Sequence, residues 1–317
     1  MGASRKEKRS GPGGLVAVRR GALGDTLLFL PVLEAFRRAF PGEETLFVGN
    51  GDYLELVSLA GLAEKTASAS TWPPLLDLHR RRGISGPPPP ELARAFRVLL
   101  EWEEDREWGR VRLFRPGPEK GVRKPLTLQV LSRLGLEESA PWPPPPLETL
   151  KKALAAKAGE GGREGKPLAV LHPGAGSPGK AWPAGRFAGL GRLLEERGWE
   201  VRVLLGPVEE ERGPGPALFR EEGLSVEVLR EVLDLGRRLA GASLYVGNDS
   251  GPSHLAAALG VPSLVLFGPT DPLVWGPPWP GAVCLAGEPS LGSLEVERVL
   301  EEACRVTGTG EGGAAAT

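Results

Sequence analysis

The sequence predicts an α/β protein with two Rossmann-like domains, whose mostly parallel sheets face each other across a cleft. An apolar run at residues 15–18 is followed by a glycine loop, a helical pattern over residues 25–40 and a second apolar run at 45–48, which together make a βαβ unit. A longer alternation of strand and helix patterns begins at residue 168. A chain of 317 residues is also too long for one ordinary hydrophobic core and suits two domains.

Each element of the first unit has a local cause. Residues 15–18 are continuously apolar, which is typical of a parallel strand buried on both faces. Between residues 25 and 40 the leucines and aromatic residues recur on one side of a helix. Pro41 and Gly42 end that helix, and the apolar run at 45–48 predicts the next strand.

The second half repeats this alternation without long interruptions. We expect strands at residues 168–171, 201–205, 243–246 and 263–267, and helices at 184–197, 231–240 and 252–259.

These patterns divide the chain into six segments. They are a disordered basic tail (1–13), an N-terminal α/β domain (14–150), a linker (151–166), a C-terminal α/β domain (167–289), a C-terminal helix (290–305) and a disordered tail (306–317). The sequence leaves open whether the C-terminal helix packs back on the N-terminal domain. Proline runs weaken the pattern between residues 70 and 146, where we expect helices near 91–104 and 126–134.

The composition narrows the class of protein. The net charge of -1 gives no general attraction to nucleic acid. Cys284 and Cys304 are the only cysteines, which excludes a disulfide framework and a four-cysteine zinc site. The scarcity of Asn, Gln and Met fits a thermophilic source. We find no signal peptide or membrane-spanning run and expect a cytoplasmic protein, with weak attraction of the basic tail to the inner face of a membrane left open.

The clearest functional segment runs from Tyr245 to Pro262 and predicts a strand, a tight turn and a short helix. Ser250 and Gly251 lie at the start of that helix, where free amide groups and the helix dipole favour an anion such as a diphosphate. Asp249 precedes them. His254 is a further candidate, although a histidine in a first helical turn is more often structural.

A second segment, residues 171–183, contains the pattern G-x-x-x-x-G-K, which begins a phosphate-binding P-loop. Ala181 replaces the magnesium-binding hydroxyl of a P-loop, and Pro178 removes one of its amide donors. We therefore expect the helix to start at Pro183 and Lys180 to lie on a loop, where its ammonium group can neutralise a phosphate. Gly176 and Ser177 on the same loop complete the predicted diphosphate contacts.

The third segment, residues 19–25, follows the first strand and is not a dinucleotide fingerprint, because only Gly21 and Gly24 are in place. Asp25 opens the helix that follows. It is either an ordinary N-cap or a carboxylate that takes a proton from an attacking hydroxyl.

Together these segments resemble the bacterial heptosyltransferases, which are family 9 glycosyltransferases acting on the lipopolysaccharide inner core. The matching motifs are Gly24-Asp25, His172-Pro-Gly-Ala-Gly with Lys180-Ala-Trp-Pro183, Gly206-Pro-Val-Glu-Glu-Glu211, Asp249-Ser-Gly-Pro-Ser-His254 and Phe267-Gly-Pro-Thr-Asp-Pro272 with Trp275. The resemblance covers about residues 15–65 and 168–283, and residues 70–146 depart from the family pattern. It implies a GT-B fold, an inverting mechanism and an ADP-heptose-like donor.

The resemblance also implies roles for the candidate residues. Asp25 would be the general base, Lys180 would contact the donor phosphates and Asp249 the sugar. Ser250 and Gly251 would donate hydrogen bonds to the diphosphate, and an acidic residue of the run 209–211, for which we take Glu209, would bind the ribose.

The expected partners are a nucleotide-diphosphate sugar, with an ADP-sugar favoured, and a glycan or glycolipid acceptor on the N-terminal domain, without a cofactor. No D-x-D pair, the usual metal-binding motif of metal-dependent glycosyltransferases, occurs in the chain, so we expect no metal. Three alternatives stay open: a nucleotide-sugar epimerase of the same architecture, a P-loop nucleotide hydrolase and a non-catalytic nucleotide-sugar binder.

Overall fold

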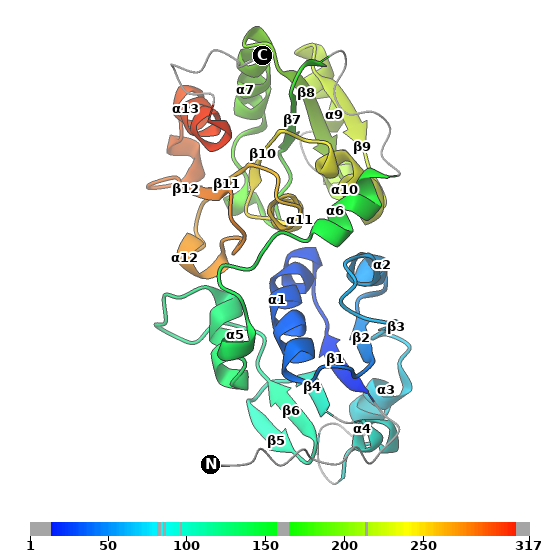
Figure 1. Cartoon of the computed structure of the whole chain (residues 1–317). Helices are drawn as coiled ribbons and strands as arrows, with labels where there is room; N and C mark the ends of the chain where they lie inside the picture. The colour runs from blue at the N-terminus through cyan, green and yellow to red at the C-terminus, as the bar shows by residue number, and fades with distance from the viewer. Residues whose placement is uncertain are drawn as a thin grey trace, which may run out of the picture.

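The chain forms two α/β domains stacked end to end, with the N-terminal domain below the C-terminal domain in Figure 1. The computed structural model describes residues 14–80, 84, 87–95, 97–156, 165–212 and 215–308. The predicted basic tail at residues 1–13, residues 157–164 of the predicted linker (151–166) and the chain from residue 309 lie outside the described residues. Residues 151–155, also predicted as linker, are helical instead.

Among the described residues, the N-terminal domain contains one six-stranded sheet of order β3-β2-β1-β4-β6-β5. Its strands are β1 (Leu15–Arg19), β2 (Thr45–Gly49), β3 (Lys65–Ser68), β4 (Arg97–Glu101), β5 (Arg106–Trp108) and β6 (Val111–Phe114). The neighbouring strands are parallel except β5 and β6, which are antiparallel. The carboxyl ends of the central strands β1, β2 and β4 therefore meet at one edge of this sheet.

The part of the C-terminal domain that is described also contains a six-stranded sheet, and all of its strand pairs are parallel. In sheet order its strands are β12 (Ala282–Ala286), β11 (Ser263–Phe267), β10 (Leu244–Asn248), β7 (Leu168–His172), β8 (Glu200–Leu205) and β9 (Ser225–Val228). The four strands predicted for this half are confirmed within one or two residues at each end.

The helices cover these sheets and fill the junction between the domains (Figure 1). In the N-terminal domain they are α1 (Leu23–Ala39), α2 (Leu54–Leu59), α3 (Pro73–Arg80), α4 (Pro90–Arg94) and α5 (Leu126–Leu134). Then follow α6 (Glu148–Ala155), α7 (Ala184–Glu196), α8 (Pro207–Arg212), α9 (Gly215–Glu221), α10 (Val232–Ala240), α11 (Gly251–Ala258), α12 (Pro272–Trp275) and α13 (Val296–Thr307).

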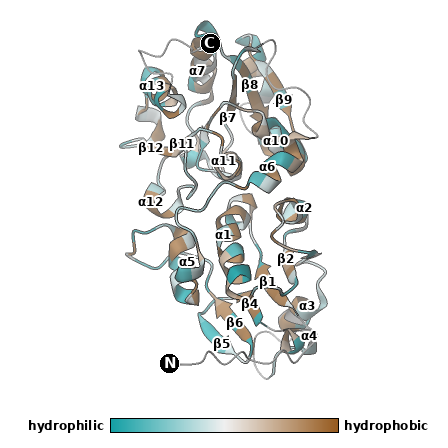
Figure 2. Cartoon of the chain, viewed as in Figure 1, coloured by the Kyte–Doolittle hydropathy of each residue, from teal (hydrophilic) through white to brown (hydrophobic). Residues whose placement is uncertain are grey.

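The central strands and α1 form as their sequences predict. All five residues of β1 are buried, because this apolar strand lies between β2 and β4 with helices on both faces. Figure 2 shows β1 and much of α1 in the brown of hydrophobic residues. The helix begins at Leu23, so Asp25 is its third residue and not its N-cap, which was one of the two roles that the sequence left open. Its carboxylate instead accepts a hydrogen bond from the backbone N–H of Ala22, the N-cap residue, at 3.2 Å.

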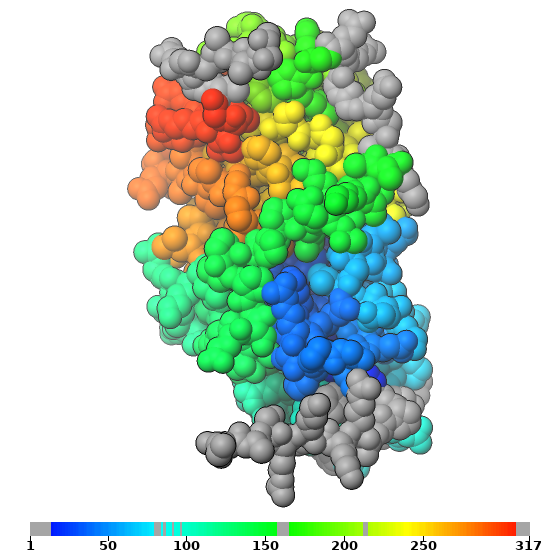
Figure 3. Space-filling view, viewed as in Figure 1, coloured from blue at the N-terminus to red at the C-terminus, as the bar shows by residue number. Residues whose placement is uncertain are grey.

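An apolar cluster joins the two domains. Helix α1 packs against α11, and the cluster includes Leu27 from the first domain and Leu255 from the second. Helix α6 packs against both α2 and α10, with Leu150 and Leu154 fully buried. In Figure 3 the green residues that include α6 extend over the junction on the face shown.

One predicted helix in the described residues is wrong, and the structure answers the question that the sequence left open about the C-terminal helix. Residues 91–104 do not form one helix: α4 ends at residue 94, and Arg97–Glu101 is strand β4, because its apolar centre is paired between β1 and β6. The C-terminal helix does not pack back on the N-terminal domain. Helix α13 packs on α7, β10 and β11, with Val299 and Leu300 in the core of the C-terminal domain, and its order extends to residue 307, into the predicted tail.

Candidate donor-binding and catalytic site

A cavity of about 490 Å³ lies at the carboxyl ends of β7, β8 and β10, where ligands bind in open parallel sheets. Residues Ala22–Gly24 and Tyr53 of the N-terminal domain close it from the other side. Four of the predicted donor-binding residues line this cavity: Gly176, Glu209, Ser250 and Gly251. The cavity therefore lies between the domains and contains part of the predicted site.

The start of α11 presents an anion-binding surface. Ser250 is the N-cap in extended conformation, and Gly251 and Pro252 are the first helical residues. The Ser250 hydroxyl is buried and has no hydrogen-bond partner among the described residues. A buried hydroxyl without a partner is unfavourable, so a ligand oxygen in the cavity would gain a hydrogen bond there.

Lys180 and Asp249 form an ion pair beside the start of α11. The Lys180 ammonium lies 2.7 Å from Asp249 Oδ2, and the Asp249 side chain is only 7% exposed. The Thr270 hydroxyl donates a second hydrogen bond to the same oxygen at 2.6 Å. The sequence analysis did not select Thr270, although it lies in one of the matching motifs. Neither Lys180 nor Asp249 lines the cavity of about 490 Å³.

The loop that carries Lys180 is not a P-loop. Pro178–Lys180 form a single 3-10 turn, and the following helix α7 starts at Ala184, directly after Pro183 as predicted. Asn248, at the end of β10, holds this loop in place. Its side chain accepts a hydrogen bond from the Trp182 backbone N–H at 3.0 Å and donates one to the Pro173 carbonyl at 2.8 Å.

Ser177 is the N-cap of that turn, between Gly176 and Lys180, and like Lys180 it does not line the cavity.

Glu209 lies on the first turn of α8, against the end of β7. Its Oε2 atom accepts a hydrogen bond from the Gly206 backbone N–H at 2.8 Å. A Cβ atom at Gly174 would collide with the Glu209 carboxylate and lie 2.6 Å from His172 Cε1, so a larger residue there would have to displace these side chains. Burial lowers the pKa of His172, and the charge of Glu209 partly opposes this shift.

Asp25 lies at the other side of the junction, where its carboxylate accepts hydrogen bonds from Arg19 and from the Ala22 backbone N–H. Arg19 Nη2 donates to Asp25 Oδ1 at 2.8 Å, and Arg19 Nη1 lies 3.0 Å from Glu101 Oε2. The Asp25 side chain remains 35% exposed. It does not line the cavity of about 490 Å³, but its neighbours in the chain, Leu23 and Gly24, do.

His254 is buried on α11 and contacts the N-terminal domain. A Cβ atom at Gly24 would lie 3.1 Å from His254 Cδ2. Burial lowers the pKa of His254 to about 4, and the carboxylates of Asp249 and Asp25 oppose this shift. His254 is therefore a neutral imidazole at pH 7, between the donor side and Asp25, and it does not line the cavity.

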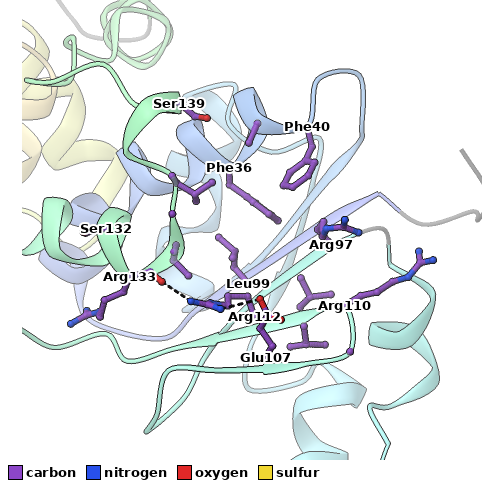
Figure 4. A pocket seen from close by; sticks show the side chains of 17 residues that line it. Phe36, Phe40, Arg97, Leu99, Glu107, Arg110, Arg112, Ser132, Arg133 and Ser139 are labelled. Carbon is purple, nitrogen blue, oxygen red and sulfur yellow. Dashed lines mark hydrogen bonds and ion pairs between the residues drawn. The ribbon is translucent and has the colours of Figure 1, made fainter. Parts of the chain in front are cut away.

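A second hollow, of about 690 Å³, lies at the opposite end of the N-terminal sheet, between α1, α5 and the strands β4–β6 (Figure 4). Three of its four arginines are bound within the protein. Arg112 pairs with Glu107 and donates to the Arg133 carbonyl, Arg133 donates to the carbonyls of Arg115 and Gly117, and Arg97 lies over the Phe40 ring.. None of the predicted site residues lines this hollow.

Two negative findings concern the described residues alone. No group of three or more His, Cys, Asp or Glu side chains lies together there in a way that could hold a metal ion. No helix there is long and apolar enough to cross a membrane.

Comparisons with solved structures define the class of fold. The structure of E. coli heptosyltransferase WaaC with ADP covers 92% of this chain and 99% of its own, with a TM-score of 0.67 and 20% identity. A family 9 glycosyltransferase from Veillonella parvula DSM 2008 gives a TM-score of 0.67 at 19% identity and covers 92% and 96% of the two chains. Two parallel-sheet domains joined across a cleft, with this likeness, form the GT-B fold of glycosyltransferases.

Sequence comparison gives the family. The sequence model of glycosyltransferase family 9 (heptosyltransferase) matches residues 119–300, which is more than half of the chain. The chain belongs to this family. The match begins after Asp25, so the family assignment comes from the region that contains Lys180, Glu209 and Asp249.

Curated relatives agree over shorter regions. Lipopolysaccharide heptosyltransferase 1 of Pseudomonas aeruginosa is 38% identical over 108 residues, or 34% of this chain and 30% of the relative. The enzyme of the same name from Escherichia coli K12 is 39% identical over 128 residues, or 39% of each chain. The alignments therefore span between about a third and two fifths of these relatives' length.

Proposed function

We propose that the protein is an inverting glycosyltransferase that moves a heptose-like sugar from an ADP-linked donor to a glycan or glycolipid acceptor without a metal ion. The observation that carries this proposal is that anion-binding groups and a carboxylate face each other across the junction of the two domains. Anion-binding groups, Ser250 and Gly251 with Lys180 beside them, belong to the C-terminal domain, and the carboxylate of Asp25 belongs to the N-terminal domain.

The donor diphosphate would occupy the cavity at the start of α11. Its oxygens would accept hydrogen bonds from the backbone N–H groups of Ser250 and Gly251 and from the Ser250 hydroxyl. Lys180 lies next to this position and would exchange part of its pairing with Asp249 for the phosphates, which leaves Asp249 able to bind a sugar hydroxyl. Glu209 lines the same cavity and would accept hydrogen bonds from the ribose.

Transfer would occur as one in-line displacement. The acceptor oxygen forms a bond to the anomeric carbon while the bond from that carbon to the diphosphate oxygen breaks, and Asp25 takes the acceptor's proton. Positive charge develops on the sugar ring, as in glycoside cleavage. The negative charge that grows on the departing diphosphate meets Lys180 and the start of α11, which are in position before the reaction begins.

The names of the relatives support the nature of the donor and the acceptor. Solved structures of similar fold were determined with ADP and with ADP-2-deoxy-2-fluoro heptose. The curated relatives are named lipopolysaccharide heptosyltransferases. A sugar nucleotide and a lipopolysaccharide-type acceptor are therefore the partners that we propose for this chain.

The first test is binding. ADP and ADP-heptose should raise the melting temperature equally with magnesium and with EDTA, whereas ATP or GTP stabilisation only with magnesium would contradict the proposal. The second test is transfer: ADP release from ADP-heptose should depend on a heptose-deficient lipopolysaccharide. Asp25→Asn should slow it by about 10²–10⁴-fold if Asp25 is the base. Retention of the donor's anomeric configuration in the product would exclude the inverting mechanism.

A further inference from the structure

A buried arginine connects Asp25 to the neighbouring strand. Arg19, the last residue of β1, has a side chain that is 7% exposed, and the side chain of Glu101, the last residue of β4, is 10% exposed. The strands are adjacent and parallel, so both residues reach the same edge of the sheet. Arg19 begins the third segment of the sequence analysis but was not selected as a site residue, and Glu101 lies outside all three segments.

Arg19 is the donor to both carboxylates of this group, Glu101 on the neighbouring strand and Asp25 on α1. Arg19 binds Glu101 with Nη1 at 3.0 Å and Asp25 with Nη2 at 2.8 Å. Glu101 Oε2 also accepts the backbone N–H of Arg20 at 2.5 Å, which fixes the start of the loop that leads to α1. The Ala22 backbone N–H donates to Asp25 Oδ2 at 3.2 Å and fixes its end. The carboxylate of Asp25 is thus held at both oxygens.

The charges indicate that Arg19 does more than balance a buried carboxylate. Glu101 alone neutralises Arg19, and both are almost fully buried. Asp25 is 35% exposed and could be hydrated without Arg19. A planar guanidinium group that binds both carboxylates adds little neutralisation for Asp25 but restricts its direction, because the donors of the arginine fork have fixed geometry.

We infer that Arg19, anchored by Glu101, is a positioning residue that holds the Asp25 carboxylate in the direction required for taking the acceptor's proton. This inference rests on the proposed role of Asp25. Arg19 acts through Asp25 and not on the substrate, because its side chain is 7% exposed and binds both carboxylates, whereas the Asp25 side chain is 35% exposed. A shift of the base by about 1 Å can slow a reaction by about 10²-fold, so loss of this support has a measurable cost.

The test is a double-mutant cycle on transfer rate, with ADP affinity as the second readout. We expect Arg19→Met to lower kcat by about 10²-fold and to leave the Kd for ADP within about twofold. Arg19→Lys should recover part of the lost rate, because a lysine keeps the charge but has no fork. In the Asp25→Asn background, Arg19→Met should have no further effect, because a residue that acts only through Asp25 has nothing left to position.

A matched control separates this role from general stability of the domain. Arg37, on the same helix as Asp25, binds Glu64 and the Gly61 carbonyl away from the junction. Arg37→Met removes an arginine of the same domain and should leave kcat unchanged. If Arg19→Met does not fold, Glu101→Gln gives the same test, because it keeps the shape of the anchor and removes its charge.

The outcomes distinguish this inference from the proposed function. A normal kcat for Arg19→Met beside an impaired Asp25→Asn would overturn the inference alone. Additive losses in the double variant would also overturn it, since they show that Arg19 acts independently of Asp25. A normal kcat for Asp25→Asn would instead overturn the assignment of the base in the proposed function.

Discussion

Gly251 and Leu23 are in direct contact across the junction of the domains. A Cβ atom at Gly251 would lie 2.8 Å from the Cβ atom of Leu23, which is closer than real side chains approach. The first residue of α11 therefore packs on the first residue of α1. The sequence analysis placed Gly251 at the anion-binding start of a helix, and the structure adds a reason for glycine at this position, the close packing of the two domains.

We expect Gly251→Ala to destabilise the protein and to weaken ADP binding. The added methyl group must displace Leu23, and overpacking of this kind costs about 1–3 kcal/mol of unfolding free energy. Chemical denaturation and ADP titration measure both effects. The control is Gly185→Ala on α7, where a Cβ meets nothing within 4 Å. Unchanged stability of Gly251→Ala would show that the junction yields easily at this point.

Lys180→Met should weaken ADP binding by about tenfold or more, because a hydrogen bond to a charged group contributes about 1.5–3 kcal/mol. The variant should also be less stable without ADP, since the buried Asp249 loses its cation and keeps only Thr270. Isothermal titration and thermal melting test the two parts. Lys65→Met is the matched control, because Lys65 pairs with Glu44 on the open surface and such pairs contribute little. Equal ADP affinity in wild type and Lys180→Met would contradict the assignment.

Glu209→Gln should reduce the discrimination between ADP and its 2′,3′-dideoxy analogue. If Glu209 binds the ribose, the wild-type protein prefers ADP by about tenfold or more, because a charged acceptor left without its donor is costly. The variant should bind the two ligands more equally. Glu222→Gln serves as the control, since Glu222 pairs with Arg192 at the surface and neither residue lines the cavity. A preference that is the same in all three proteins would assign the ribose to another residue.

The stability of the protein should fall between pH 6.5 and pH 4 through His254. Burial lowers the pKa of His254 in the folded protein to about 4, below its ordinary value of 6.5. Within this window the unfolded chain binds a proton that the folded protein does not, so unfolding becomes more favourable as the pH falls, by up to about 1.4 kcal/mol per pH unit. Below about pH 4 this contribution no longer changes.

His254→Gln tests this expectation, because glutamine does not titrate and the other histidines are unchanged. The difference in melting temperature between pH 7 and pH 4.5 should be smaller in the variant than in the wild type. Parallel curves for the two proteins would show that His254 is not the titrating group.

The donor side of the site could be predicted from the sequence because its signals are local. Strand β10, the turn at Asp249 and the helix α11 follow one another within about twenty residues, and each has its own pattern of burial, cap and stop. The same holds for Lys180, since Pro183 alone predicts where α7 begins. Apolar runs between turn residues likewise predicted the four central strands of the C-terminal sheet, whereas the outer strands β9 and β12 were not predicted.

The support of Asp25 could not be predicted, because its causes are not local. Glu101 lies 81 positions from Arg20 and meets it only through the pairing of β4 with β1. The run that forms β4 has no turn residues or alternation to distinguish it from the end of a helix. Asn248 and Thr270 were present in the selected segments, but only the fold shows which partners their side chains reach.

The apolar cluster shared by the two domains couples their unfolding. Leu150 and Leu154 of α6 are fully buried, and α1 and α11 cover each other's apolar faces. Separation of the domains would expose these faces to water, which is unfavourable at about 25 cal/mol for each Å² of apolar surface. Neither half therefore keeps its full stability alone. Heating should give a single calorimetric transition, with equal calorimetric and van't Hoff enthalpies, although the chain has the architecture of two domains.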